Sequence, residues 1–221
     1  MARWQRFIVA AFVTMSAAVA VPATDALGSA QRIMIYGDSL SAAYGIEPRY
    51  GWVSLLQTRL QPAGVTVVNS SISGETTRGG LSRIKTDLAR VRPNVVVLAL
   101  GANDGLRGLP ITDTQRNLQA IISDIQASGA RVALVGIQIP PNYGIEYSQQ
   151  FRDLYYHLAR QNHLVPPPFL LEGIADKPEL FQADRLHPSA EAQPAILENV
   201  LPVIRKALEL HTAARKANGK S

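Results

Sequence analysis

The 221-residue sequence contains no cysteine. This absence excludes a disulfide-stabilised scaffold, thiolate metal sites and a cysteine nucleophile, although it does not exclude an oxidising compartment. After the first 30 residues, no apolar run reaches the ~20 residues that a membrane-spanning helix needs. With 47% apolar and 18% charged residues, the composition is typical of a globular chain. We therefore expect one domain with a substantial core.

The body of the chain also lacks net charge, although the whole sequence carries +5. Five basic residues against Glu209 give the last 17 residues +4, and two arginines against Asp25 give residues 1–30 +1. Together these account for the whole +5 and leave residues 31–204 neutral. We therefore expect no nucleic-acid partner, because that function needs a basic folded surface. The basic tail over 211–221 is expected to be solvated, with a weak attraction to anionic membrane surfaces.

The N-terminus has the pattern of a secretory signal. Arg3 and Arg6 precede an apolar run over 7–21, and small residues that offer cleavage sites follow. The alternative is an uncleaved membrane anchor, which the short apolar run disfavours. We predict a signal peptide over residues 1–23, with cleavage between 20 and 30, and a periplasmic or secreted protein.

From residue 31 onward, strand-like and helix-like segments alternate five times. Strands are predicted over 33–36, 65–69, 95–100, 131–137 and, as a proline-rich edge strand, 165–171. Helices are predicted over 51–60, 81–91, 112–127, 147–161 and 189–210. Thr112 or Asp113 is expected to cap the third helix. The alternation predicts a single α/β domain over 31–210, a three-layer α/β/α sandwich around a five-stranded parallel sheet of flavodoxin-like topology.

Glycines and short polar residues gather where the predicted strands end. The first strand runs into residues 37–39, and later strands run into 70–76, 101–105 and 138–142. The carboxyl ends of parallel strands meet at one rim of a sheet, where ligands bind in such folds. We therefore expect one site at this rim, with Ser39 as the candidate nucleophile.

A serine nucleophile needs a base and a group that orients the base. Of the four histidines, only His187 follows a carboxylate by three residues in a predicted turn, with Asp184 as that carboxylate. Asp184 can then bond one ring nitrogen while the other faces Ser39. The alternative, favoured for such a short motif in isolation, is a structural Asp–His turn at the start of the last helix.

Gly74 and Asn103 are the candidate donors to an oxyanion. Gly74 lets a backbone N–H approach a ligand without a Cβ, and Asn103 offers a side-chain amide. The alternatives are a plain turn glycine and an Asx-turn. The sequence contains no dinucleotide or phosphate loop, no H-E-x-x-H and no G-x-S-x-G motif.

Four sequence blocks, in their order along the chain, resemble those of the GDSL, or SGNH, hydrolases. They are residues 37–41, 69–76, 100–108 and 141–144. The four residues of the SGNH signature are found here as Ser39, Gly74, Asn103 and His187. The resemblance covers about residues 31–205, and the blocks look like those of the periplasmic multifunctional esterases. Those enzymes act as acyl-thioesterases, arylesterases and lysophospholipases. One departure is Arg185, since many members have a glycine after the aspartate.

The resemblance implies an SGNH hydrolase fold and hydrolysis of carboxylic esters and thioesters through an acyl-enzyme, without metal or cofactor. Ser39 would be the nucleophile, His187 the base and Asp184 its orienting acid. The oxyanion would be stabilised by the backbone N–H groups of Ser39 and Gly74 and by the amide of Asn103.

Two apolar loops are expected to meet beside Ser39 and to form a groove for an acyl chain. Their residues are Leu106, Leu109, Ile139, Pro140 and Tyr143. Ordinary loop packing is an equally weighted alternative. A carbohydrate acetyl-esterase, an acyltransferase and a non-catalytic lipid-binding module remain as alternative functions. The expected partner is a small-molecule acyl ester or thioester, bound by a monomer.

Overall fold

The computed structural model describes residues 31–218, so the predicted signal peptide lies outside the described residues. Parallel strands form one sheet in the order β2-β1-β3-β4. The strands are β1 (Arg32–Gly37), β2 (Thr66–Asn69), β3 (Val95–Ala99) and β4 (Arg131–Leu134). This order is that of the flavodoxin-like topology predicted from the sequence.

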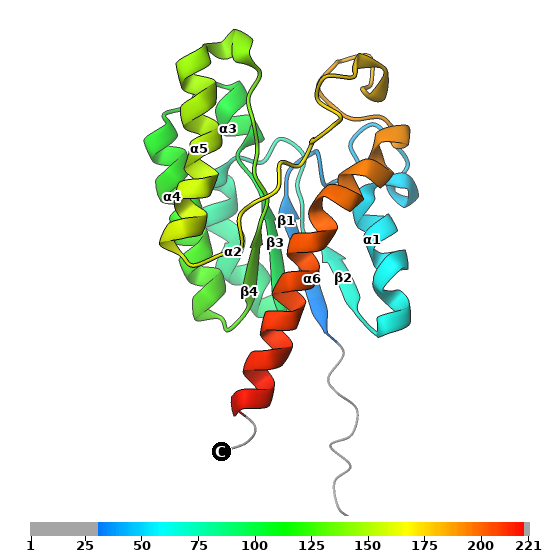
Figure 1. Ribbon diagram of the computed structural model, residues 1–221, viewed down its shortest axis with the longest axis vertical. Helices are drawn as coiled ribbons and strands as arrows, with labels where there is room; N and C mark the ends of the chain where they lie inside the picture. The colour runs from blue at the N-terminus through cyan, green and yellow to red at the C-terminus, as the bar shows by residue number, and fades with distance from the viewer. Residues whose placement is uncertain (1–30, 219–221) are drawn as a thin grey trace, which may run out of the picture.

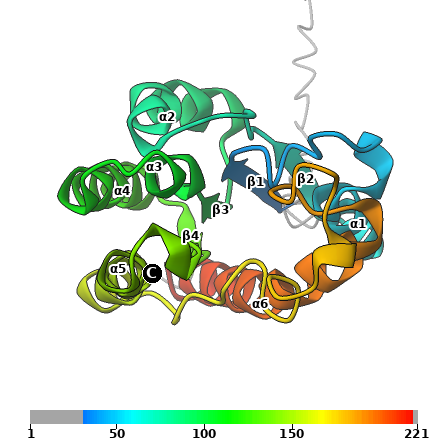
Figure 2. The same cartoon turned by 90° about the horizontal axis from the view of Figure 1, so that it is seen from above.

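Helices cover both faces of the sheet. They are α1 (Trp52–Leu60), α2 (Thr77–Val91), α3 (Ala102–Leu106), α4 (Ile111–Ala127), α5 (Ile145–Gln161) and α6 (Gln193–Asn218). Seen along the strands, α2 and α4 lie on one face and α1 and α6 on the other, while α5 packs against α4 (Figure 2). The three-layer α/β/α sandwich is therefore confirmed.

The middle of the sheet is buried on both faces. All five residues of β3 are at most 1% exposed, and their continuous run of Val, Leu and Ala shows no polar alternation. In the register of β1 and β3, Gly37 lies opposite Ala99. The segments that follow these two strands therefore emerge at the same rim of the sheet, as the figure of the whole chain shows (Figure 1).

The prediction of a fifth strand over 165–171 was wrong. Within the described residues this segment makes only an isolated parallel bridge, between Gly136 and Phe169. Gly136 donates its N–H to the Pro168 carbonyl, and Leu170 donates to the Gly136 carbonyl. Pro166 to Pro168 have no N–H to donate, so the ladder cannot extend.

Several helices begin or end at residues other than those predicted. The third predicted helix begins at Ile111 after Pro110, with no side-chain cap from Thr112 or Asp113. The second begins at Thr77, earlier than predicted, because the Thr76 hydroxyl accepts the Gly79 N–H. The last α-helix runs to Asn218 rather than ending near residue 210.

Candidate active site

Three side chains meet at the rim where β1 ends. The Ser39 hydroxyl oxygen lies 2.9 Å from Nε2 of His187. On the other side of the ring, Nδ1 lies 2.7 Å from Oδ2 of Asp184. The structure thus brings together all three residues predicted for the triad. In this geometry the ring can accept the serine proton while the carboxylate stabilises the imidazolium.

The turn over 184–187 is built on the Asp184 carboxylate. Its Oδ1 accepts the backbone N–H groups of Leu186, at 2.9 Å, and His187, at 3.0 Å. The His187 N–H, then the His187 ring and the Leu186 N–H, lower the pKa of Asp184 to about 2. Asp184 is therefore ionised at neutral pH and can hold the ring of His187 in one orientation.

A second set of contacts fixes the His187 segment against the loop that follows β1. The Gln182 amide donates to the Tyr44 carbonyl at 2.8 Å, and the Gln182 N–H donates to the His187 carbonyl at the same distance. The Tyr44 ring packs against the His187 ring with centroids 4.4 Å apart. Sequence reasoning missed Tyr44, for which the only signal is an aromatic residue shortly after Ser39.

Two side-chain hydrogen bonds, one from α1 and one from the end of β2, hold the loop that carries Ser39. The Trp52 indole donates to the Leu40 carbonyl at 3.1 Å, and the Asn69 amide donates to the Ser41 carbonyl at 2.8 Å. Asp38 lies beneath this loop, 1% exposed, and accepts the Leu40 N–H. Burial, more than the nearby carboxylates, raises the pKa of Asp38 to about 7.

The two candidate oxyanion donors lie on neighbouring loops. The Asn103 amide donates one hydrogen bond, 3.0 Å long, to the Glu75 carbonyl, which leaves its second N–H for a ligand. Gly74 has φ +79°, and no atom lies within 4 Å of where its Cβ would be. Asn103 lines the pocket next to Ser39, whereas Gly74 is not among the residues that line it. Arg107 donates to the Gly74 carbonyl at 3.2 Å and joins the two loops.

An ion-pair network centred on Arg83 supports the loop that carries Gly74. Arg83 lies 2.7 Å from Glu75 and 2.6 Å from Asp87, and its guanidinium stacks over the Tyr36 ring. The side chains of Glu75 and Asp87 are only 11% and 12% exposed. The network holds the loop that carries the Gly74 N–H and the carbonyl that orients Asn103. Sequence reasoning missed it: Arg83 and Asp87 are four residues apart on α2, but no local pattern pairs Arg83 with Glu75.

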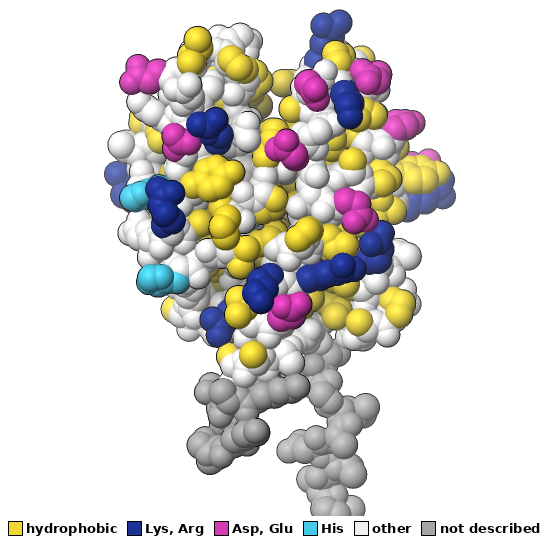
Figure 3. All heavy atoms as spheres, viewed as in Figure 1, with side chains coloured by type: hydrophobic (Ala, Val, Ile, Leu, Met, Phe, Trp, Pro, Cys, Tyr) yellow, Lys and Arg dark blue, Asp and Glu magenta, His cyan; other side chains and the backbone are white. Residues whose placement is uncertain are grey.

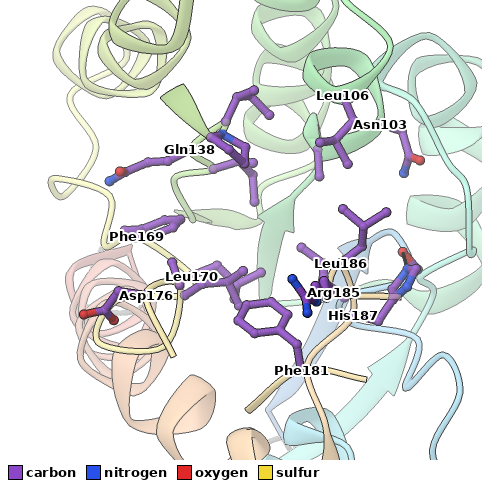
Figure 4. Close-up of a pocket in the computed structure, with 18 of the residues that line it drawn as sticks. Asn103, Leu106, Gln138, Phe169, Leu170, Asp176, Phe181, Arg185, Leu186 and His187 are labelled. Carbon is purple, nitrogen blue, oxygen red and sulfur yellow. Dashed lines mark hydrogen bonds between the residues drawn. The ribbon is translucent and has the colours of Figure 1, made fainter. Parts of the chain in front are cut away.

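A pocket of about 470 Å³ opens beside Ser39 and His187 (Figure 4). Of the predicted groove residues, Leu106, Ile139 and Pro140 line it, whereas Leu109 and Tyr143 do not. The opposite wall comes from the segment that follows the proline run and includes Phe169, Leu170, Leu171 and Phe181. In the space-filling view, the surface is hollowed between two lobes at the top of the molecule, where the strands end (Figure 3).

An α/β/α sandwich with a Ser–His–Asp chain at its strand ends defines a serine hydrolase of the flavodoxin-like type. The chain belongs to the GDSL-like lipase/acylhydrolase family, which matches residues 35–194. It is therefore an enzyme that hydrolyses acyl esters, as the sequence predicted.

Characterised relatives agree with this membership. The chain is 46% identical to the esterase TesA of Pseudomonas aeruginosa over 182 residues, which cover 81% of this chain and 90% of TesA. It is 38% identical to thioesterase 1/protease 1/lysophospholipase L1 of Escherichia coli K12 over 77% of this chain and 81% of that protein. The crystal structure of TesA matches with a TM-score of 0.76 and 44% identity, covering 80% of this chain and 99% of that one.

A further solved structure is that of the esterase EstA from Pseudoalteromonas sp., inhibited by monoethylphosphonate. It matches with a TM-score of 0.77 and 41% identity, over 81% of this chain and 99% of that one.

Proposed function

We propose that Ser39 attacks the carbonyl carbon of an acyl ester or thioester and forms an acyl-enzyme. As the Ser39 oxygen bonds to carbon, its proton passes to Nε2 of His187. When the tetrahedral intermediate collapses, His187 returns that proton to the leaving alcohol or thiol. Water then repeats the cycle on the acyl-enzyme and releases the carboxylic acid. The observation that carries this proposal is the hydrogen-bonded chain from Ser39 through His187 to Asp184.

The oxyanion of each tetrahedral intermediate would be held by the backbone N–H groups of Ser39 and Gly74 and by the Asn103 amide. Support comes from the rigidity of the Asn103 amide, which Glu75 anchors, and from the left-handed backbone of Gly74. Losing one such donor typically raises the barrier by about 3–4 kcal/mol.

The pocket supports an apolar acyl chain as the group next to the scissile carbonyl. Its lining is mostly aliphatic and aromatic, with few polar side chains near Ser39. The names of the relatives, which include an arylesterase of Vibrio mimicus as well as the thioesterase/lysophospholipase, support both oxygen and sulfur leaving groups. We propose no sugar substrate, because the lining offers few hydrogen-bonding groups.

The proposed location is the periplasm or the exterior, on the basis of the signal pattern in residues 1–23. None of the helices that the structure describes is long and apolar enough to cross a membrane. Lys, Arg, Asp and Glu side chains are interspersed on the face shown in Figure 3, which supports a small-molecule rather than a nucleic-acid partner.

A fluorophosphonate probe tests the nucleophile, and a chain-length series tests the pocket. Wild-type protein is expected to label and to cleave p-nitrophenyl esters, and Ser39→Ala is expected to do neither. The kcat/KM should rise with acyl length for both ester and thioester substrates. A wild-type protein that neither labels nor cleaves would overturn the mechanism. A flat profile or a preference for acetyl would overturn the acyl pocket and favour a carbohydrate acetyl-esterase.

A further inference from the structure

Arg185 has a backbone conformation that suits glycine. Its φ is +55°, in the left-handed region where a Cβ is unfavourable by about 1–2 kcal/mol. The turn requires this conformation, because the chain must fold back so that Asp184 accepts the N–H groups at 186 and 187. By contrast, Arg92 has a similar φ of +50° but stands at the C-terminal cap of α2, where left-handed residues are common. Such strain at a site invites a functional explanation for the side chain.

The Arg185 side chain lines the pocket together with Ser39 and His187. Figure 4 shows its guanidinium directed into the pocket, whereas the carboxylate of Asp176 points away at the far edge. Arg185 is exposed, and within the described part of the chain its guanidinium makes no ion pair and no hydrogen bond. The nearest acid in sequence, Asp184, is already occupied by His187 and Leu186. The rim of the pocket therefore presents one cation without an ion-pair partner, in a lining that is mostly apolar.

We propose that Arg185 is a specificity-determining residue that binds an anionic group, a carboxylate or a phosphate, carried by the substrate. This inference rests on the proposed function of the site. The planar guanidinium matches both anions through paired N–H donors. The anion can come from either side of the scissile bond. It is either a carboxylate at the far end of the acyl chain or a phosphate on the leaving alcohol.

Two substrate pairs distinguish these sources, since the members of each pair differ only in the anionic group that one of them carries. The first pair is p-nitrophenyl hexanoate and the p-nitrophenyl monoester of adipic acid. The second is 1-dodecanoylglycerol and its 3-phosphate. For each pair, the ratio of kcat/KM for the anionic and the neutral member is measured in wild type, Arg185→Gly, Arg185→Lys and Arg92→Gly.

Arg185→Gly should fold well, because glycine suits the backbone at this position. In one of the two pairs, the ratio is expected to fall about tenfold in Arg185→Gly and by less in Arg185→Lys, which keeps the charge but loses the paired donors. High salt should lower the wild-type ratio. The matched control Arg92→Gly also removes one arginine from a left-handed position, but outside the pocket, and should keep the wild-type ratio.

The proposal is overturned if the ratio is unchanged in Arg185→Gly for both pairs, or if Arg92→Gly lowers it equally. Failure of the proposed function has a different signature. In that case Ser39→Ala would still hydrolyse the neutral esters, whatever the ratios show.

Discussion

Both carboxylate oxygens of Asp184 are bonded to the same residue, His187. Oδ1 accepts the backbone N–H of His187 at 3.0 Å, and Oδ2 lies 2.7 Å from its ring nitrogen Nδ1. One carboxylate therefore sets both the position of the backbone and the orientation of the ring that faces Ser39. This double contact explains how a base on a partly exposed turn can be held in a single geometry.

Replacing Asp184 with asparagine should separate these two contacts. The amide oxygen can still accept the backbone N–H, but the amide nitrogen then faces Nδ1 and favours the wrong tautomer. We expect kcat to fall by about 10³- to 10⁴-fold, with a thermal midpoint close to that of wild type. Steady-state kinetics with a p-nitrophenyl ester measure kcat, and a melting curve measures the thermal midpoint. Full activity in Asp184→Asn would show that Asp184 only shapes the turn.

The Arg83 network should couple stability to the geometry of the oxyanion loop. Arg83→Met leaves Glu75 nearly buried without a cation, whereas Asp87 keeps its ion pair with Arg90. We expect the free energy of unfolding to fall by about 3 kcal/mol. Urea denaturation measures this loss.

Arg83→Met should also lower kcat more than it raises KM, because the Gly74 loop acts mainly on the transition state. The surface pair of Arg116 and Asp113 offers a control, since breaking it should change stability by less than about 1 kcal/mol. A loss of stability with unchanged kcat would mean that the network does not position the loop.

Asp38 should make stability depend on pH in the range between 4 and 7. The folded pKa of about 7 lies above the ordinary value of 3.8, because burial disfavours the carboxylate. Between these values the folded protein binds more protons than the unfolded chain, so stability falls as the pH rises. The slope should not exceed about 1.4 kcal/mol per pH unit.

Asp38→Asn removes this titration and keeps an oxygen for the Leu40 N–H. Its free energy of unfolding should therefore fall less steeply than that of wild type between pH 4 and 7. Urea curves collected at several pH values test the difference. Parallel curves for the two proteins would assign the pH dependence to other groups.

Leu106 tests whether the pocket sets the acyl length. Leu106→Trp fills part of the cavity, so the ratio of kcat/KM for dodecanoyl over butanoyl esters should fall about tenfold. Leu109→Trp is the matched control, since Leu109 lies just beyond α3, three residues after Leu106, but does not line the pocket. Equal effects of the two variants would indicate that loop disturbance, not cavity volume, changes the preference. A melting curve checks that Leu106→Trp is not overpacked.

The layers of the fold and the residues of the candidate triad could be predicted from the amino-acid sequence. Continuous apolar strands can be buried only between two helical layers, and a parallel sheet sends the ends of its strands to one rim. Ser39 and Asn103 follow such strands directly, so their meeting is a consequence of chain direction. His187 was identified because Asp184 is close in sequence, and contacts within one turn are local.

Features that depend on contacts between distant segments could not be predicted and became visible only in the folded chain. Because of the prolines at 166–168, the predicted fifth strand makes only a single bridge. The segment that follows these prolines forms the far wall of the pocket. Arg83 reaches Glu75, and Tyr44 packs on His187, through packing that no local pattern encodes. Arg185 stands beside the base in the sequence, but its left-handed backbone and its place in the pocket follow from the folded turn. Side-chain direction is set by the backbone conformation that the surrounding contacts impose.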